Sequence, residues 1–247
     1  MKPKLLDLYC CEGGASEGYR RAGFDVYGVD LFEDYSQKRY PFPSAKMNAL
    51  DALEKVIDGG WIIFERHFEG LIFESIVSRF AAISASPPCQ RHSAGTRSGD
   101  RTKYPDLIGP TRKLLVETGL PYVIENVEGA PLENPVMLCG RMFGLSATDD
   151  DGTHLVLDRH RMFESNVSLT APEHPKHGDE QVAGVYGGAR RDKWEAKHVR
   201  GGGYVPPNKK VAQELLGIDW MTWKGMHQSI PPAYTEHIGR QLMEAVK

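Results

Sequence analysis

The amino-acid sequence predicts an α/β protein with a doubly wound, mostly parallel sheet and a small irregular subdomain. Three observations lead to this prediction. Strand-like and helix-like segments alternate from residue 4 to about residue 165. A glycine-rich turn joins the first strand to the first helix. Residues 168–210 are rich in Gly, Pro and His and lack a regular apolar period, so we expect loops and short strands there.

The first β-α-β unit spans residues 4–32, "KLLDLYCCEGGASEGYRRAGFDVYGVDLF". Lys4–Tyr9 is the first expected strand. Ala15–Ala22 is the first expected helix and is closed by Gly23. The second strand lies in "DVYGVDLF" and carries Asp30 near its carboxyl end.

The remaining elements follow from apolar spacing and from glycine and proline stops. In 61–80, "WIIFERHFEGLIFESIVSRF", apolar residues recur at helical spacing with charges between them, which predicts mostly helix. We expect further helices at 51–58, 111–119 and in "VAQELLGIDWMT" and "PPAYTEHIGRQLMEAVK", and strands in "AAISAS" and "PYVIENV".

The length of 247 residues is enough for one large domain without disulfides. We expect a catalytic and cofactor-binding α/β domain at 1–167, a small recognition segment at 168–210, and helices at 211–247 that return to the first domain. The net charge of −3 argues against a protein that coats nucleic acid, but a local basic surface remains compatible with it.

Four cysteines occur, and no pair of them has C-x-x-C spacing, so we expect no metal site. Reduced thiols in a cytoplasmic protein are the expected state. No apolar run approaches the length of a membrane span, and the start of the chain is too short and too acidic for a signal peptide.

"SASPPCQRHSAG" places Cys89 directly after two prolines at the end of an expected strand. Pro87 and Pro88 fix the backbone and stiffen this exit. In an open α/β sheet, ligands bind at the carboxyl ends of strands, so Cys89 stands where a nucleophile would act. The alternative is a buried structural cysteine, which we expect instead for Cys10 and Cys139.

Two acidic residues end expected strands. Glu125 follows a β-branched run, where burial raises the pKa of a carboxyl and suits it to proton donation. A salt-bridged strand end is the alternative. Asp30 stands where doubly wound folds hold ribose hydroxyls. The glycine turn after the first strand could approach the same ligand, and a tight turn without a ligand is the alternative.

Positive charge is concentrated in two loop-like segments. Residues 91–104 hold four basic residues and one acidic residue, and residues 187–210 hold seven basic and two acidic residues. Aromatic residues interleave in the second segment, which suits contact with phosphates and bases, although a solvated loop is the alternative. In "LDRHRMFE", Arg159 and Arg161 are two apart, so on a strand they would share one face.

Taken in order, "DLYCCEGGASEGYRRAGF", "GVD", "SPPCQ", "ENV", "RHR" and "HQSIPPAYTEHIG" resemble the cytosine-5 DNA methyltransferases, especially compact phage or restriction-modification enzymes. The resemblance covers about residues 4–245, with 168–210 as the variable part. It implies a Rossmann-like methyltransferase fold, S-adenosylmethionine as methyl donor with S-adenosylhomocysteine as product, and flipped cytosine in double-stranded DNA as acceptor. It also implies a monomer in a bacterial cell or phage-infected bacterium.

The resemblance assigns roles to individual positions. Cys89 would attack carbon 6 of the ring, Glu125 would donate a proton to ring nitrogen 3, and Asn126 would order the cysteine loop. Arg161, supported by Arg159, would contact the base oxygen and the catalytic carboxylate. The implied cofactor-binding residues are Tyr9, Gly13, Gly14, Asp30, Leu31, Asp51, Ala52, Pro88, Gln228 and Ser229. The expected DNA-binding residues are Arg91, Ser93, Arg97, Tyr186, Arg190, Arg191, Trp194 and Arg200.

The sequence departs from the family pattern at three places. Cys11 replaces a usual glycine beside the cofactor, Leu157 replaces a usual glutamine, and His227-Gln228 replaces Gly-Asn. Three alternatives therefore stay open: the same chemistry on structured RNA such as tRNA, a catalytically silent nucleic-acid-binding homologue, and an altered methyl donor.

Overall fold

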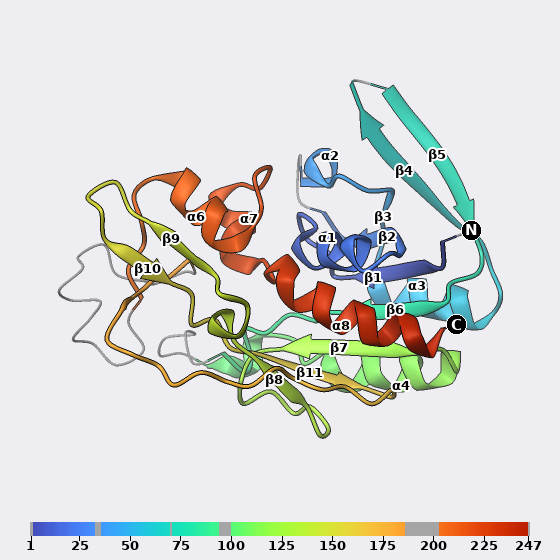
Figure 1. Cartoon of the computed structure of the whole chain (residues 1–247). Coiled ribbons are helices and arrows are strands. Elements are labelled where there is room, and N and C mark those ends of the chain that lie inside the picture. Colours follow the sequence, from blue (N-terminus) through green and yellow to red (C-terminus); the bar gives the residue numbers. More distant parts are fainter. Residues whose placement is uncertain (1, 33–35, 70, 94–99, 186–202, 247) are drawn as a thin grey trace.

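A computed structural model describes residues 2–32, 36–69, 71–93, 100–185 and 203–246, and its centre is a nine-stranded sheet (Figure 1). The strand order is β5-β4-β3-β2-β1-β6-β7-β11-β8. The strands of this sheet are β1 (Lys4–Leu8), β2 (Asp25–Asp30), β3 (Ser44–Lys46), β4 (Ile62–Phe68), β5 (Leu71–Val77), β6 (Ala82–Ala85), β7 (Tyr122–Asn126), β8 (Val136–Leu138) and β11 (Arg161–Ser165).

The central five strands, β3-β2-β1-β6-β7, pair in parallel, as expected for a doubly wound sheet. The strand order reverses direction between β1 and β6. At such a point the two connections leave on opposite sides and open a crevice beyond the carboxyl ends of the strands. The segments after β1 and after β6, which carry Tyr9 and Cys89, therefore meet at this crevice.

Helices cover both faces of the sheet (Figure 1). They are α1 (Gly14–Arg21), α2 (Ser36–Arg39), α3 (Ala49–Ile57), α4 (Ile108–Thr118), α6 (Lys209–Leu216), α7 (Trp223–Gln228) and α8 (Pro232–Ala245), with short 3-10 turns η1 (Arg101–Lys103) and η2 (Gly140–Phe143). None of these helices is long and apolar enough to cross a membrane.

Strand β1 is buried on both faces because alternate side chains enter different hydrophobic clusters. Leu5 packs with Tyr19 of α1 and Tyr234 of α8. Leu6 points to the opposite face and belongs to a second cluster, which includes Leu53 of α3 and Leu115 of α4. This arrangement confirms the fold predicted from the first β-α-β unit.

Residues 61–80 form a β-hairpin, so the prediction of a helix there was wrong. β4 pairs with β5 in antiparallel register, and the Phe68↔Leu71 pairing leaves a two-residue connection. Glu69 has φ 50°, a conformation typical of two-residue hairpin turns. Helical and strand spacing are hard to separate in a segment this apolar, and its β-branched and aromatic residues favour a strand.

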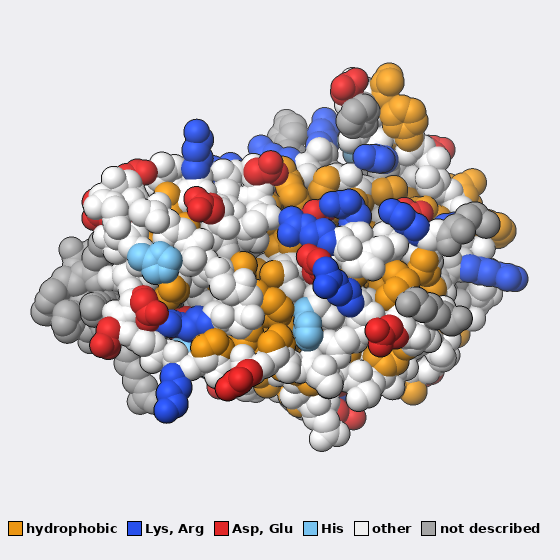
Figure 2. All heavy atoms as spheres, in the orientation of Figure 1, with side chains coloured by type: hydrophobic (Ala, Val, Ile, Leu, Met, Phe, Trp, Pro, Cys, Tyr) orange, Lys and Arg blue, Asp and Glu red, His pale blue; other side chains and the backbone are white. Residues whose placement is uncertain are grey.

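The hairpin carries exposed apolar side chains, which lie on the surface at the upper right of Figure 2. Ile63, Leu71, Ile72, Phe73 and Ile76 are each more than half exposed. The half of the hairpin nearest the sheet, with Ile62, Phe64 and Val77, enters the core.

The alternation of strand and helix stops at β7, earlier than the expected residue 165. β11 pairs antiparallel with β7, and β8 pairs antiparallel with β11. The segment between β7 and β11 has no helical apolar period, and it forms only short strands and the turn η2.

A second, three-stranded sheet lies to the left of the large one in Figure 1. Its strands are β9 (Ser146–Thr148), β10 (His154–Val156) and β12 (Gln181–Val182). Leu155 and Val185 pack there with Leu215 of α6 and Met226 of α7. This smaller lobe thus draws on residues from before and after the expected 168–210 segment.

Candidate active site

A cavity of about 540 Å³ lies where β1, β2, β6 and β7 end. Residues 221–230, which include α7, line it from the other side. The cavity brings together nine of the residues predicted from the sequence: Tyr9, Gly14, Asp30, Pro88, Cys89, Glu125, Arg161, Gln228 and Ser229.

The cysteine loop is held by the neighbouring strand. The side-chain amide of Asn126 donates to the carbonyl of Pro87 at 2.9 Å, and this bond is buried. The backbone amides of His92 and Ser93 both donate to the carbonyl of Cys89 at 2.9 Å, which closes a turn directly after it. Cys89 therefore projects from a loop fixed on both sides, and its side chain lines the cavity.

Glu125 and Arg161 form an ion pair beside Cys89. Arg161 Nε lies 3.0 Å from Glu125 Oε1. Burial raises the pKa of Glu125, while the guanidinium of Arg161 opposes that rise. Burial also raises the pKa of the Cys89 thiol, and Arg161 lowers it. One guanidinium therefore stabilises the charged forms of both groups in a largely desolvated site.

The four cysteines differ in their surroundings. Burial raises the pKa of Cys11 to about 12, with Asp30 adding to the rise. Burial raises the pKa of Cys10 well above its ordinary value, and Asp30 and Asp7 add to it. For Cys89, an arginine is the largest influence after burial. Among the four thiols, Cys89 is the one for which a cation that favours the thiolate is the largest influence on the pKa after burial.

Arg159 and Arg161 do not share one strand face, since β11 begins only at Arg161. Arg159 is buried and donates to the carbonyl oxygens of Met226, at 3.2 Å, and Ser229. Tyr234 in turn donates its hydroxyl to the Arg159 carbonyl at 2.6 Å. Arg159 therefore fastens the 226–229 wall of the cavity to the start of β11.

The glycine turn brings backbone and a carboxylate together at the end of β1. Gly13 has φ 90°, which favours glycine, and it precedes α1. A Cβ on Gly14 would lie 2.1 Å from Ser229 Oγ, so only glycine fits against that wall. Asp30 accepts from the amides of Cys11 at 2.8 Å and Leu31 at 2.7 Å, which fixes its carboxylate at the cavity.

Cys11 adopts φ 51°, the left-handed region in which glycine is common. We expect Cys11→Gly to change the free energy of unfolding by less than about 1 kcal/mol, because relief of strain offsets added chain entropy. Cys11→Val should cost about 1–3 kcal/mol, since a β-branched side chain resists this conformation. Urea unfolding measures both. Equal losses in the two variants would contradict a backbone origin.

The other predicted cofactor residues are not part of the described cavity lining, although Gly13 and Leu31 are sequence neighbours of residues that are. Gly13 shapes the turn, and Leu31 is 63% exposed. Asp51 is exposed in the first turn of α3, whereas Ala52 is buried beneath that helix.

The predicted DNA contacts divide into two groups. Arg91 lies 3.8 Å from Asp106 and donates to the Tyr104 carbonyl at 3.3 Å, so it links the two ends of the loop after Cys89. Ser93 lies in the turn that follows Cys89. The remaining predicted contacts lie outside the described residues: Arg97, Tyr186, Arg190, Arg191, Trp194 and Arg200.

Sequence reasoning did not single out two acidic residues at this site. Asp7 is fully buried in β1, burial raises its pKa to about 7, and it accepts from Ser16 in α1. Glu12 accepts from the Thr222 hydroxyl at 2.7 Å and binds the 221–230 wall to the glycine turn. An acidic residue inside an apolar strand was the available signal for Asp7.

Comparisons with known proteins give structural matches alone. No protein-family model matches the sequence, and no curated protein does. A protein described as a DNA modification methyltransferase, encoded within an E. coli prophage, has a TM-score of 0.56 at 13% identity, with 98% of this chain and 99% of that chain covered. The chain has the fold of that methyltransferase structure.

Two eukaryotic structures are similar over the same extent. The Dnmt2 methyltransferase of S. pombe has a TM-score of 0.54 at 11% identity, with both chains fully covered. The methyltransferase EhMeth of Entamoeba histolytica has a TM-score of 0.55 at 12% identity, with 100% of this chain and 99% of that chain covered. These similarities therefore extend over the length of the chain and concern its overall fold.

Proposed function

We propose that this protein is an S-adenosylmethionine-dependent DNA cytosine-5 methyltransferase. The observation that carries the proposal is the grouping of Cys89, Arg161 and Glu125 on one cavity wall, beside a turn and carboxylate suited to a nucleoside. The methyltransferase fold supports the same reaction class. The order of motifs in the sequence favours cytosine carbon 5 as the methylated atom.

The residues at the end of β1 fit the proposed cofactor. The cavity volume is in the range of small-molecule sites. The Asp30 carboxylate is placed to accept from ribose hydroxyls, and Tyr9 offers an aromatic ring against which adenine can pack. Gln228 and Ser229 add polar groups from the opposite wall. When bound, S-adenosylmethionine supplies an electrophilic methyl group on a sulfonium.

The protein's own groups then make cytosine nucleophilic. Cys89 Sγ bonds to carbon 6, and protonated Glu125 gives its proton to ring nitrogen 3, so carbon 5 gains enamine character. After methylation, the carbon-5 proton passes to water, the electrons of that C–H bond form the 5,6 double bond, and the C6–S bond breaks to release the Cys89 thiolate. Nitrogen 3 returns its proton to Glu125. Arg161 Nε lies 3.0 Å from Glu125 Oε1 and so orients that carboxyl, and its charge favours the thiolate of Cys89.

DNA is the proposed substrate because positive charge follows the cysteine loop and concentrates in the recognition segment. A base within a duplex must leave the stack before Cys89 can reach it, at a cost of a few kcal/mol. Arg91 follows Cys89 by two residues, and Cys89 lines the cavity, so the loop that carries Arg91 is placed to contact DNA beside the flipped base.

The deciding experiment measures tritium transfer from methyl-labelled S-adenosylmethionine to double-stranded DNA and to tRNA in parallel. We expect transfer to DNA, with the label recovered as 5-methylcytosine. Transfer to tRNA alone would assign the same chemistry to RNA. A protein that binds DNA but neither transfers the methyl group nor binds the cofactor would instead be a catalytically silent homologue.

A further inference from the structure

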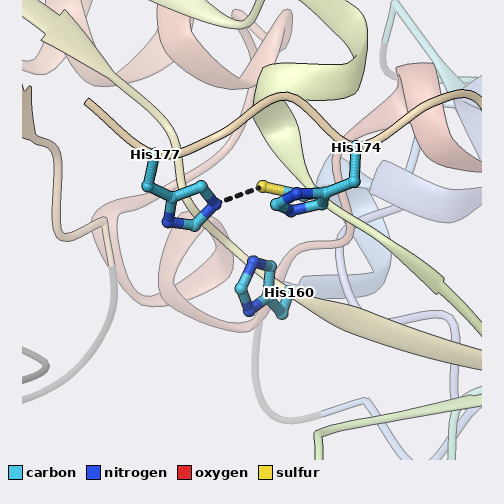
Figure 3. A group of neighbouring side chains, drawn as sticks. His160, His174 and His177 are labelled. Carbon is cyan, nitrogen blue, oxygen red and sulfur yellow. Dashed lines mark hydrogen bonds between the residues drawn. The ribbon is translucent and has the colours of Figure 1, made fainter.

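Four side chains that commonly bind metals, none of which lines the cavity of the candidate active site, converge on one another (Figure 3). They are Cys139, His160, His174 and His177, and one ligand atom from each lies within 4.8 Å of all the others. Cys139 follows β8, and His160 precedes β11. His174 and His177 form an H-x-x-H pair in the segment between β11 and β12.

The imidazole rings present nitrogen atoms to a common centre. Cys139 Sγ lies 3.6 Å from His177 Nε2, the contact dashed in Figure 3. His160 Nε2 and His174 Nε2 are buried and have no hydrogen-bond partner among the described residues. Ring centroids are 5.0 Å apart for His174 and His177 and 5.3 Å apart for His160 and His177. Buried polar nitrogens without partners are costly, and a cation at the centre would satisfy them.

Carboxylates lie beside the outer nitrogens of two of the rings. His177 Nδ1 lies 3.3 Å from Asp158, and His160 Nδ1 lies 3.8 Å from Glu128. Arg141 fixes Asp158 in turn, with Nε–Oδ1 at 2.5 Å. A carboxylate on the outer nitrogen of a histidine is the usual support of a metal-binding imidazole, because it leaves the other nitrogen free to coordinate.

We propose that Cys139, His160, His174 and His177 bind one structural Zn²⁺ ion in a tetrahedral site. One thiolate and three imidazoles form a borderline-soft donor set that suits this ion. All four positions would be filled by protein, which indicates a structural site without an open position for substrate. Binding would release the Cys139 thiol proton to solvent.

The observed geometry is close to that of a tetrahedral zinc site. With Zn–S near 2.3 Å and Zn–N near 2.0–2.1 Å, sulfur and nitrogen ligands should be separated by about 3.6 Å. The distance between Cys139 Sγ and His177 Nε2 equals this value. No pair of ligand atoms in the group is more than 4.8 Å apart. Closing a pair at that distance to tetrahedral spacing takes about 1–1.5 Å, which side chains on the 166–180 coil can supply.

The position of the site indicates what the metal would do. It would join the edge strands β8 and β11 of the large sheet to the coil that leads into β12 of the small sheet. His160 stands between Arg159 and Arg161 in the sequence, so the same ion would fix the chain that presents both arginines. The absence of C-x-x-C spacing predicted no metal site, whereas the H-x-x-H spacing of His174 and His177 was the available signal for one.

The first test is metal content of the full chain, measured by inductively coupled plasma mass spectrometry after incubation with Zn²⁺ and removal of excess ion. We expect one Zn²⁺ per chain, and at least a tenfold loss of affinity in His174→Ala and His177→Ala. The matched control is His154→Ala, an exposed histidine on β10 outside the cluster. Zinc absent from the wild type, or retained equally in all three variants, would overturn the proposal.

The second test replaces Zn²⁺ with Co²⁺ and records the absorption spectrum. We expect tetrahedral ligand-field bands together with a thiolate-to-cobalt charge-transfer band, and we expect Cys139→Ser to remove the latter. Cys89→Ser should keep the full spectrum. Because that control lacks the proposed nucleophile, metal binding is measured independently of methyl transfer. A charge-transfer band that vanishes in Cys89→Ser and persists in Cys139→Ser would refute the assignment of the ligand.

Discussion

Replacement of Cys89 by serine is expected to lower methyl transfer to DNA by about 10⁴-fold or more, because the hydroxyl cannot replace the thiolate as nucleophile. The same change should abolish covalent trapping on DNA that contains 5-fluorocytosine. Fluorine cannot leave carbon 5 as the proton does, so the Cys89 adduct would persist in the wild type. Denaturing electrophoresis of protein bound to labelled DNA measures the adduct.

Cys11→Ser is the matched control, since Cys11 also lines the cavity. Its pKa of about 12 keeps it protonated at neutral pH, so loss of its thiol should leave adduct formation intact. A Cys89→Ser protein that still forms the adduct would remove Cys89 from the mechanism. Cofactor binding, followed by calorimetry, should be preserved in both variants and would show that each remains folded.

The fold was predictable where local signals agreed. The glycine turn after β1, the stop at Gly119 and the apolar strands all indicated a parallel α/β sheet, which the structure confirms. The 61–80 segment was predicted wrongly because its apolar residues fit both a helix and a hairpin. Pairing of β4 with β3 and β5 decided between them, and such long-range contacts cannot be derived from spacing alone.

The candidate site was predictable in part for a similar reason. Cys89, Glu125 and Asp30 end strands, and the carboxyl ends of parallel strands meet at one edge, so their proximity follows from the fold. The bonds of Arg159 to the 226–229 backbone depend on how α7 and α8 return to the sheet. The histidine cluster likewise forms only when a coil passes back over β8 and β11, which no local pattern indicates.

Replacement of Glu125 by glutamine should lower methyl transfer by about 10²–10⁴-fold, because the amide cannot donate an acidic proton to ring nitrogen 3. Single-turnover rates with saturating cofactor and DNA measure the effect. Glu133→Gln makes the same chemical change at an exposed site and should be nearly neutral. Unchanged turnover in Glu125→Gln would exclude this carboxyl as the proton donor.

The pH dependence of stability separates a catalytic effect from a structural one. Burial raises the pKa of Glu125 above its ordinary value of 4.5, so the folded state binds a proton that the unfolded state has already lost. Between pH 4.5 and the higher pKa of Glu125 in the folded state, the free energy of unfolding should therefore fall as pH rises. Glu125→Gln should remove this contribution to the pH dependence. Urea unfolding across this range tests the sign. In Glu125→Gln, Arg161 keeps a polar amide partner in place of the carboxyl group, so the fold should be preserved. If the variant is folded, shows the flatter pH profile and has lost methyl transfer, the defect lies in proton donation.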